Sequence, residues 1–207
     1  MATTLRVNPQ HPKKLHVDRA VEVLKRDGVI IYPTDTIYGL GCDVTSRAAV
    51  ERIRQIKGRD ADKPMSFMCS NLVQVGRYGR VSNFIHGILS RFLPGPYTFV
   101  LTATPETPPL LQSKQKTVGI RIADHPVPMA LVEQLGSPLV STSANESNEE
   151  VLTRPEELEG TFGSHVDLIL ECGILPIEAS SVISLVNDKI DILREGLGNL
   201  DYFKALT

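Results

Sequence analysis

The chain has 207 residues and a formal net charge of −2. This length suits one domain with its own hydrophobic core, and we expect residues 1–207 to form a single domain. The ordinary apolar content excludes a disordered, fibrous or membrane-embedded chain, and the slight acidity argues against a generally basic nucleic-acid surface, though not against a local basic groove.

The cysteines and histidines predict neither a disulfide framework nor a metal site. The three cysteines, Cys42, Cys69 and Cys172, are widely spaced and odd in number, and the five histidines show no metal-ligand spacing. The polar N-terminus carries no apolar signal-peptide core, and no apolar run has the length of a membrane span. We therefore expect a cytoplasmic protein without membrane association, with cysteines that are small core residues.

Hydrophobic periodicity and turn residues divide the chain into helices and strands after an extended lead-in over residues 1–16. Helices are predicted from Val17 (capped by Asp18) to Gly28, from Thr45 to Gly58, and over about 71–79, 82–92, 125–136 and 155–161. Strands are predicted over 29–32, 65–69, 97–104, 117–122, 138–140, 166–170, 181–186 and 189–194, the last two joined by a turn at Asn187-Asp188. Helices and strands alternate early and strands crowd late, which predicts a single α/β domain with a mixed sheet.

Two polar stretches each follow a predicted strand. The first is Pro-Thr-Asp-Thr-Ile-Tyr-Gly-Leu-Gly at 33–41, and the second is Ser-Thr-Ser-Ala-Asn at 141–145. A strand that runs into hydroxyl groups and glycine backbone is a common way to build a pocket, because these groups approach a ligand closely. The first stretch alone suits a capped tight turn equally well, and the second stretch favours the pocket.

Basic residues occur where an anion would bind. Lys57, Arg59 and Lys63 fall within seven residues, in a loop that suits either an anion site or a solvated helix end. Arg121 lies in the middle of an apolar strand, and burying an unpaired guanidinium is very costly. It must therefore face a solvated pocket or pair with a carboxylate of the protein or of a ligand, and Arg194 at the end of the last strand makes a similar case.

Several familiar catalytic motifs are absent from the sequence. It has no P-loop, no Gly-x-Gly-x-x-Gly fingerprint after the first strand and no Gly-x-Ser-x-Gly elbow. Cations and hydroxyl groups without an obvious nucleophile predict a site for a phosphorylated or carboxylated ligand, with catalysis by positioning and charge stabilisation. His125, four residues after Arg121, is the histidine that we expect to border this site.

Seven motifs, in order along nearly the whole chain, resemble those of the YrdC/YciO family: Pro-Thr-Asp-Thr-x-Tyr-Gly-Leu (33–40), Lys-Gly-Arg (57–59), Pro-Gly-Pro-x-Thr (94–98), Gly-Ile-Arg-Ile (119–122), Ser-Thr-Ser-Ala-Asn (141–145), Ser-Val-Ile (181–183) and Leu-Arg-x-Gly (193–196). The resemblance implies a twisted α/β fold with a large, concave, positively charged cavity. The best-known members are threonylcarbamoyl-AMP synthases, which are nucleotidyltransferases that condense L-threonine, bicarbonate and ATP and release pyrophosphate. Their product feeds threonylcarbamoyladenosine modification of tRNA, and the family has also been associated with double-stranded RNA.

The resemblance also implies roles for particular residues. The family's catalytic signature falls on Lys57, Arg59, Ser143 and Asn145. ATP with Mg²⁺ would meet Arg59, Lys63, Thr117, Ser143 and Arg194, and the amino-acid substrate would meet Thr36, Arg121 and Ser141. The implied reaction is attack of a carbamate on the α-phosphate, with Arg121 holding the threonine carboxylate and cations stabilising the charge that develops.

Some positions depart from the synthases. Where these usually carry a His, four residues after Pro64, this chain has Met68, which cannot hydrogen-bond threonine as His does. The stretches 66–69, 97–101 and 194–198 are closer to the YciO branch, while the catalytic signature is kept. Three functions stay open: a synthase, a double-stranded RNA or tRNA-binding module, and a YciO-type ATP-binding enzyme with another small carboxylate as substrate.

Overall fold

The structure, a computed structural model, describes residues 1–58, 65–145 and 149–206. Within these residues one ten-stranded sheet runs in the order β1-β8-β2-β3-β7-β4-β6-β5-β9-β10. Its strands are β1 (Thr3–Arg6), β2 (Ile30–Tyr32), β3 (Gly39–Asp43), β4 (Ser66–Met68), β5 (Tyr97–Thr102), β6 (Thr117–Arg121), β7 (Leu139–Ser143), β8 (Leu168–Glu171), β9 (Ser181–Ser184) and β10 (Asp191–Arg194). Strand β4 pairs parallel with β6 and antiparallel with β7, so the predicted mixed sheet is confirmed.

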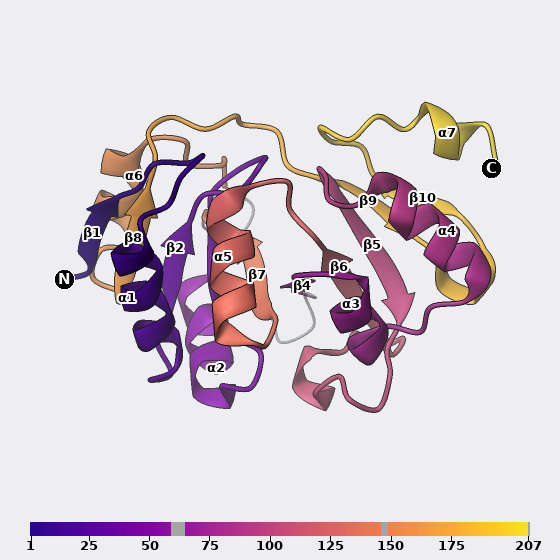
Figure 1. Ribbon diagram of the computed structural model, residues 1–207, viewed down its shortest axis with the longest axis horizontal. Helices are drawn as coiled ribbons and strands as arrows, with labels where there is room; N and C mark the ends of the chain where they lie inside the picture. The colour runs from indigo at the N-terminus through magenta and orange to yellow at the C-terminus, as the bar shows by residue number, and fades with distance from the viewer. Residues whose placement is uncertain (59–64, 146–148, 207) are drawn as a thin grey trace.

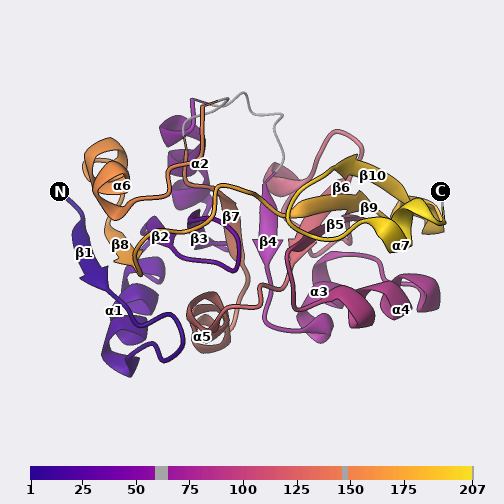
Figure 2. The same cartoon turned by 90° about the horizontal axis from the view of Figure 1, so that it is seen from above.

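Helices cover the sheet on both faces. They are α1 (Lys14–Leu24), α2 (Arg47–Ile56), α3 (Leu72–Tyr78), α4 (Asn83–Phe92), α5 (Pro126–Leu135), α6 (Pro155–Phe162) and α7 (Asp201–Lys204), with 3₁₀ turns η1 (Pro109–Leu111) and η2 (Val186–Asp188). Helices α1 and α5 pack side by side on one face, and α2 and α6 lie across the sheet from them (Figures 1 and 2). Among the described residues no helix has the length and apolar character of a membrane span.

The strand register separates large from small residues in the middle of the sheet. Directly paired residues share a face, and successive residues of a strand alternate between faces. One face carries the core residues Leu40, Cys42, Val140, Phe67, Ile120 and Phe99. The other face carries Gly39, Gly41, Ser141, Ser143, Ser66 and Gly119. Side chains this small cannot fill a second core layer, so this part of the sheet is left open.

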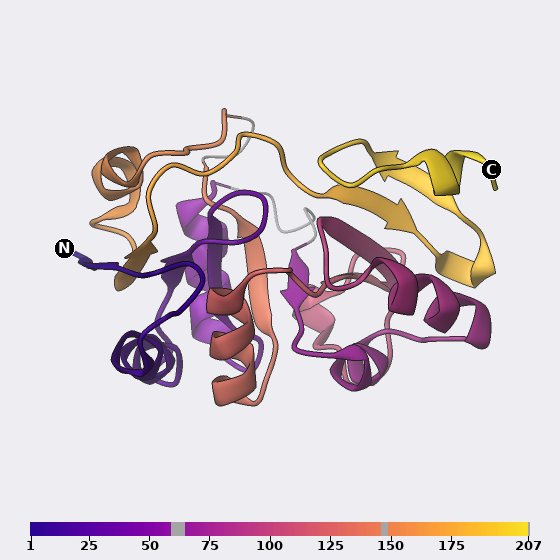
Figure 3. The ribbon, with the colours of Figure 1, turned by 45° about the horizontal axis from the view of Figure 1, so that its top comes forward.

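Helix α3 packs on the same face as α2, although the two helices lie on opposite sides of the view in Figure 2. The contact between Phe67 of β4 and Tyr78 of α3 fixes this assignment, with the two ring centroids 5.3 Å apart. Because α2 and α3 pack on the same face of the sheet but lie on opposite sides of the view, the sheet must twist strongly between β7 and β4. In Figure 3 the C-terminal strands (yellow) lie at the end of the sheet opposite to α1 (indigo).

Most predicted elements are present, and their caps explain their ends. Ser46 accepts a hydrogen bond from the backbone N–H of Ala49 (3.1 Å) and starts α2, as its position before an apolar stripe predicts. Gly58 adopts a φ of +53° after α2. Asn187 and Asp188, each with a φ of +58°, form the predicted turn between β9 and β10.

Some local predictions were wrong. Asp18 does not cap α1, because the helix begins at Lys14 and Asp18 lies one turn inside it, paired with the Lys14 ammonium at 2.8 Å. Residues 141–143 form the end of β7 rather than a loop, and residues 39–43 form β3. The lead-in likewise contains β1. Glycine and serine hide the alternation that identifies a strand, because neither contributes an apolar signal.

The cysteines lie where the composition predicts. Cys42 and Cys69 are buried in the core and are free thiols, and Cys172 is half-buried. Burial raises the pKa of the Cys42 and Cys69 thiols far above neutral pH. Both thiols therefore stay protonated and behave as small apolar residues.

Two glycines of β3 make room for a tyrosine ring. Tyr32 of β2 is fully buried, and its hydroxyl donates to Ser141 Oγ on β7 at 2.7 Å, across the intervening strand β3. A Cβ at Gly39 would lie 3.0 Å from Tyr32 Cζ, and a Cβ at Gly41 would lie 2.9 Å from Tyr32 Cε1 and 2.8 Å from the Val140 carbonyl oxygen. Any side chain on these glycines would displace the ring.

We predict that Gly41→Ala lowers the free energy of unfolding by about 2 kcal/mol, because its methyl group overpacks against backbone and ring. Urea unfolding measures this loss. The matched control is Gly87→Ala in α4, where an added Cβ meets nothing within 4 Å and alanine favours the helix. Equal stability of the wild type and Gly41→Ala would show that the ring and β3 are not packed as described.

Candidate functional site

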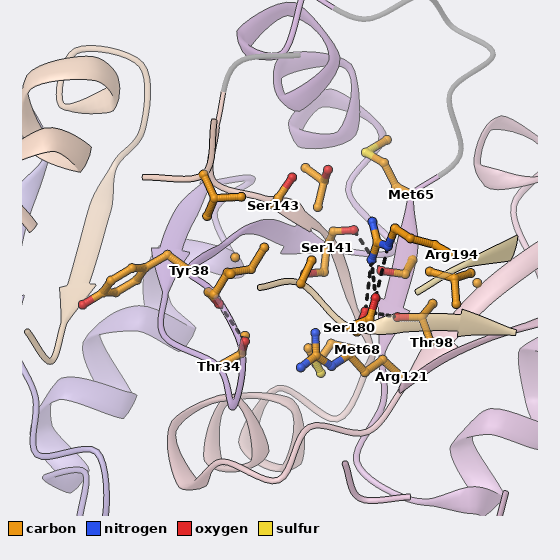
Figure 4. A pocket seen from close by; sticks show the side chains of 18 of the residues that line it. Thr34, Tyr38, Met65, Met68, Thr98, Arg121, Ser141, Ser143, Ser180 and Arg194 are labelled. Carbon is orange, nitrogen blue, oxygen red and sulfur yellow. Dashed lines mark hydrogen bonds between the residues drawn. The ribbon is translucent and has the colours of Figure 1, made fainter. Parts of the chain in front are cut away.

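A cavity of about 430 Å³ opens on the small-residue face of the sheet (Figure 4). Its floor comes from strands β3, β7, β4, β6, β5 and β9, and its rim comes from the loop after β2 and from the ends of β7 and β10. The polar residues that line it are Thr34, Tyr38, Ser66, Thr98, Thr117, Arg121, Ser141, Thr142, Ser143, Asn145, Ser180 and Arg194. The cavity thus combines two arginines with many hydroxyl groups.

Arg121 forms a buried ion pair in the wall of this cavity. Its Nη2 donates to Asp35 Oδ1 at 2.6 Å and to Thr36 Oγ1 at 2.9 Å, and the two charged side chains are 9% and 10% exposed. The sequence required either a solvated pocket or a carboxylate partner, and the structure gives Arg121 both. Thr36, which is fully buried, lies behind Arg121 and supports it together with Thr34.

This ion pair is only half satisfied. Among the described residues, neither Nε of Arg121 nor Oδ2 of Asp35 has a hydrogen-bond partner, although both atoms are buried. Buried polar atoms are nearly always paired, so each exception calls for an explanation. A ligand that brings a hydrogen-bond acceptor to Arg121, after a small adjustment of the pair, would remove one of the two deficits.

Arg194 approaches the same cavity from the last strand. Its Nε and Nη2 donate to the Ser180 carbonyl oxygen at 3.1 and 2.7 Å, and Ser180 Oγ lies 2.9 Å from Thr98 Oγ1. Burial and then the nearby charge of Arg121 lower the pKa of Arg194. Two guanidinium groups that repel each other in one cavity favour an anion between them.

Lys57 holds the end of β7 in place by hydrogen bonds. Its ammonium, which is buried, donates to the Ser143 carbonyl oxygen and to Asn145 Oδ1, each at 2.8 Å, and also to the Asn145 carbonyl oxygen. The Ser143 hydroxyl donates to the same Asn145 Oδ1 at 2.5 Å. Three predicted catalytic residues are therefore in contact, with Ser143 and Asn145 lining the cavity and Lys57 holding their backbone.

The other predicted residues divide into two groups. Ser141 and Thr117 line the cavity, and Thr117 Oγ1 lies 2.7 Å from the Ser113 hydroxyl. Arg59 and Lys63 lie outside the described residues, so their predicted contacts with a nucleotide stay predictions.

Met68 lies beside Arg121. The two residues are paired in the register of β4 and β6, and Met68 is buried and lines the cavity (Figure 4). A thioether accepts hydrogen bonds only weakly, so this part of the wall is apolar where a histidine would offer a strong donor or acceptor.

Four residues of the site were not predicted from the sequence: Asp35, Ser66, Thr98 and Ser180. Asp35 lies within the first polar stretch, but nothing local pairs it with an arginine 86 residues later. Ser66 alternates with Phe67 on β4, so a period of two would have placed it on the face opposite the core. Thr98 and Ser180 contact each other only because β5 and β9 pair, which no local pattern reveals.

His125 caps a helix instead of lining the cavity. Its Nδ1 accepts a hydrogen bond from the Val127 backbone N–H at 3.2 Å at the start of α5. Burial lowers the pKa of this imidazole, and the nearby carboxylates of Asp35 and Asp124 oppose that shift only in part. The cap also requires an unprotonated Nδ1.

The match with known proteins agrees with this geometry. Residues 22–196 match the model of the Sua5_yciO_yrdC family, described as Telomere recombination, and the chain therefore belongs to the Sua5/YciO/YrdC family. The uncharacterized protein YciO of Escherichia coli is 37% identical over 199 residues, which cover 95% of this chain and 97% of the relative. The crystal structure of E. coli YciO superposes with a TM-score of 0.93 at 35% identity, covering 98% of this chain and all of that one.

Two further relatives have more informative names. A threonylcarbamoyl-AMP synthase of Vibrio vulnificus is 34% identical over 158 residues, which cover 75% of this chain and 85% of the relative. The structure of P. abyssi Sua5 complexed with L-threonine superposes with a TM-score of 0.92 at 26% identity, covering 99% of this chain and 61% of that chain.

We predict that Asp35→Asn lowers the free energy of unfolding by about 3 kcal/mol, because it leaves the buried guanidinium of Arg121 without a counter-charge. Urea unfolding measures the loss. Asp35→Asn combined with Arg121→Met should recover more than half of it. Asp124→Asn, which removes a nearby exposed carboxylate, should stay within about 0.5 kcal/mol of wild type. A similar effect of both single changes would contradict the pairing.

The pH dependence of stability provides a test of the His125 cap. A folded-state pKa below the usual value of 6.5 means that the unfolded chain binds the proton more readily. The contribution of His125 to stability is therefore complete above pH 6.5 and is lost as the pH falls toward the lower folded-state pKa. Urea unfolding between pH 5 and 8 should show a smaller decrease in His125→Asn, because asparagine caps the helix without titrating. The same decrease in both proteins would contradict this.

Proposed function

We propose that this protein binds ATP and a small carboxylate in the cavity and joins them as a threonylcarbamoyl-AMP synthase or a close relative of that enzyme. The observation that carries the proposal is the half-satisfied Arg121–Asp35 pair, with a second arginine, Arg194, lining the same cavity. Relatives named threonylcarbamoyl-AMP synthase, and a Sua5 structure that holds L-threonine, support it.

The arrangement of charges suggests a place for each substrate. A carboxylate fits at Arg121, whose Nε lacks an acceptor. The phosphates of ATP fit nearer to Arg194, with the hydroxyl groups of Thr117 and Ser143 as further donors. In this proposal Arg59 and Lys63 add two more charges and make the cavity positive.

In the proposed reaction the amine of L-threonine first combines with bicarbonate to give a carbamate and water. A carbamate oxygen then forms a bond to the α-phosphorus of ATP, and the bond from that phosphorus to the bridging oxygen breaks, so that pyrophosphate leaves. Arg194 and the hydroxyl groups would stabilise the negative charge that grows on the phosphoryl oxygens. The product would feed threonylcarbamoyladenosine modification of tRNA in the cytoplasm.

Mg²⁺ enters the proposal as part of the ATP substrate. When bound, it supplies charge neutralisation to the phosphates. The described residues contain no group of three or more His, Cys, Asp or Glu side chains that would hold a metal ion. This donor set fits a Mg²⁺ ion that is held mainly by phosphate oxygens and water, while the protein contributes its cations and hydroxyl groups.

Met68 favours a second candidate within the same reaction type. It places an apolar side chain beside Arg121, where a substrate side chain would lie if its carboxylate met the guanidinium. A carboxylate with an apolar side chain fits this wall better than the hydroxyl of threonine. The alternative is therefore an ATP-dependent enzyme that acts on a different amino acid or small carboxylate.

Calorimetric titration tests the proposal. ATP with Mg²⁺ should bind the free protein, and L-threonine should bind the ATP-loaded protein. Arg121→Ala should weaken the threonine step more than about 100-fold, since a charged hydrogen-bonded contact is lost from a buried site, while ATP affinity changes less than about threefold. Arg194→Ala should show the opposite selectivity. No binding of ATP by the wild type would contradict the proposal.

The side-chain preference separates the two candidates. We predict that Met68→His increases affinity for L-threonine about tenfold and decreases affinity for L-valine, which has the shape of threonine without the hydroxyl. Competition titrations on the ATP-loaded protein measure both values. A wild type that already prefers L-threonine over L-valine, with no change on Met68→His, would exclude the second candidate.

A further inference from the structure

The route from Tyr32 to the cavity passes across a neighbouring strand. Tyr32 ends β2, and its ring passes over Gly39 and Gly41 of β3 to reach β7. There the hydroxyl lies 2.7 Å from Ser141 Oγ. Tyr32 itself is fully buried and is not among the residues that line the cavity, whereas Ser141 is. Its hydroxyl therefore reaches the cavity through the hydrogen bond to Ser141.

In this hydrogen bond the Tyr32 hydroxyl is the donor and Ser141 Oγ is the acceptor. Burial also raises the pKa of Tyr32 to about 12, so the phenol keeps the proton that it donates. A serine hydroxyl has one proton and two lone pairs. Because one lone pair accepts from Tyr32, the Ser141 proton is directed to another partner. In the described part of the chain, Ser141 Oγ donates to no protein atom, and its open side is the cavity.

We propose that Tyr32 is a positioning residue that makes Ser141 a committed hydrogen-bond donor to an anionic oxygen of the ligand. The inference rests on the proposed function of the cavity and deepens it by assigning the polarity of one contact. A carboxylate or phosphoryl oxygen accepts this hydrogen bond, and an ammonium group cannot. Ser141 lies on the same face of the sheet as Arg121, across β4, so both residues present donors to the same space (Figure 4).

The hydrogen bond from Tyr32 to Ser141 gives the two glycines of the first polar stretch, Gly39 and Gly41, a functional role. Any side chain at Gly39 or Gly41 would push the ring away from Ser141 and release the Ser141 hydroxyl to rotate. A freely rotating hydroxyl presents either a proton or a lone pair to the ligand, and it loses rotational freedom when it binds. The hydrogen bond from Tyr32 therefore preorganises the Ser141 hydroxyl as a donor before the ligand binds.

A double-mutant cycle distinguishes this role from simple packing. Titrations use three probes: ATP with Mg²⁺, L-threonine on the ATP-loaded protein, and inorganic phosphate. Tyr32→Phe should weaken at least one probe about three- to tenfold, and Ser141→Ala should weaken the same probe at least as much. The double variant should match Ser141→Ala, because Tyr32 acts only through that hydroxyl. The probe that is affected shows whether the acceptor is the carboxylate or a phosphate.

The matched control is Tyr97→Phe. Tyr97 is also a buried tyrosine, and its hydroxyl donates to the Asn199 carbonyl oxygen at 3.1 Å, away from the residues that line the cavity. Its loss should leave all three affinities unchanged. Gly41→Ala is a second variant should Tyr32→Phe fold poorly: its Cβ would lie 2.9 Å from Tyr32 Cε1, so it displaces the ring while keeping the phenol, and it should weaken the same probe as Ser141→Ala.

Several results would overturn the inference. Tyr32→Phe and Gly41→Ala could both leave every affinity at the wild-type value while Ser141→Ala weakens one. Alternatively, the losses of Tyr32→Phe and Ser141→Ala could add in the double variant. A wild type that binds inorganic phosphate, but neither ATP nor L-threonine, would end the proposed function, and the phosphate cycle would still decide the role of Tyr32. A wild type that binds none of the probes would end both.

Discussion

The alternation of small and large residues on the central strands is the constraint on which the site depends. One face of β3, β7, β4 and β6 carries large apolar residues and forms the main core. The opposite face carries glycines and serines, and their small side chains leave the space that forms the cavity. The same alternation lets the Tyr32 ring cross β3 and places Ser66, Ser141 and Arg121 on one surface. A single change of register would exchange the core and the cavity.

Charge gives this cavity its chemical character. A buried arginine is tolerated only with a counter-charge, and Asp35 supplies it to Arg121 at 2.6 Å. The pairing is incomplete, because one nitrogen of the arginine and one oxygen of the aspartate lack partners. Arg194, held by Ser180, adds a second cation, and burial and then the nearby charge of Arg121 lower its pKa. A ligand with anionic groups would supply an acceptor to Arg121 and a counter-charge to both arginines, which is the physical basis of the proposed function.

Much of the fold follows from the sequence, and the site follows only in part. The helix caps at Ser46 and Gly58 and the apolar strands could be predicted, because each depends on local periodicity and turn chemistry. Strand β3 and the end of β7 could not, since glycine and serine give no apolar signal. Arg121 could be singled out because a guanidinium in an apolar strand demands a partner. The identity of that partner, and the buried position of Lys57, depend on contacts between residues far apart in the chain.

The proposed function requires Arg121 to bind the carboxylate of a ligand and Arg194 to bind a phosphate. A crystal structure of the protein with L-threonine and a non-hydrolysable ATP analogue with Mg²⁺ tests it most directly. We expect the carboxylate within hydrogen-bond distance of the Arg121 guanidinium, Ser141 Oγ donating to an anionic oxygen, and phosphate oxygens beside Arg194. An Arg121 that still contacts only Asp35 and Thr36, with both ligands bound elsewhere, would contradict the proposed function.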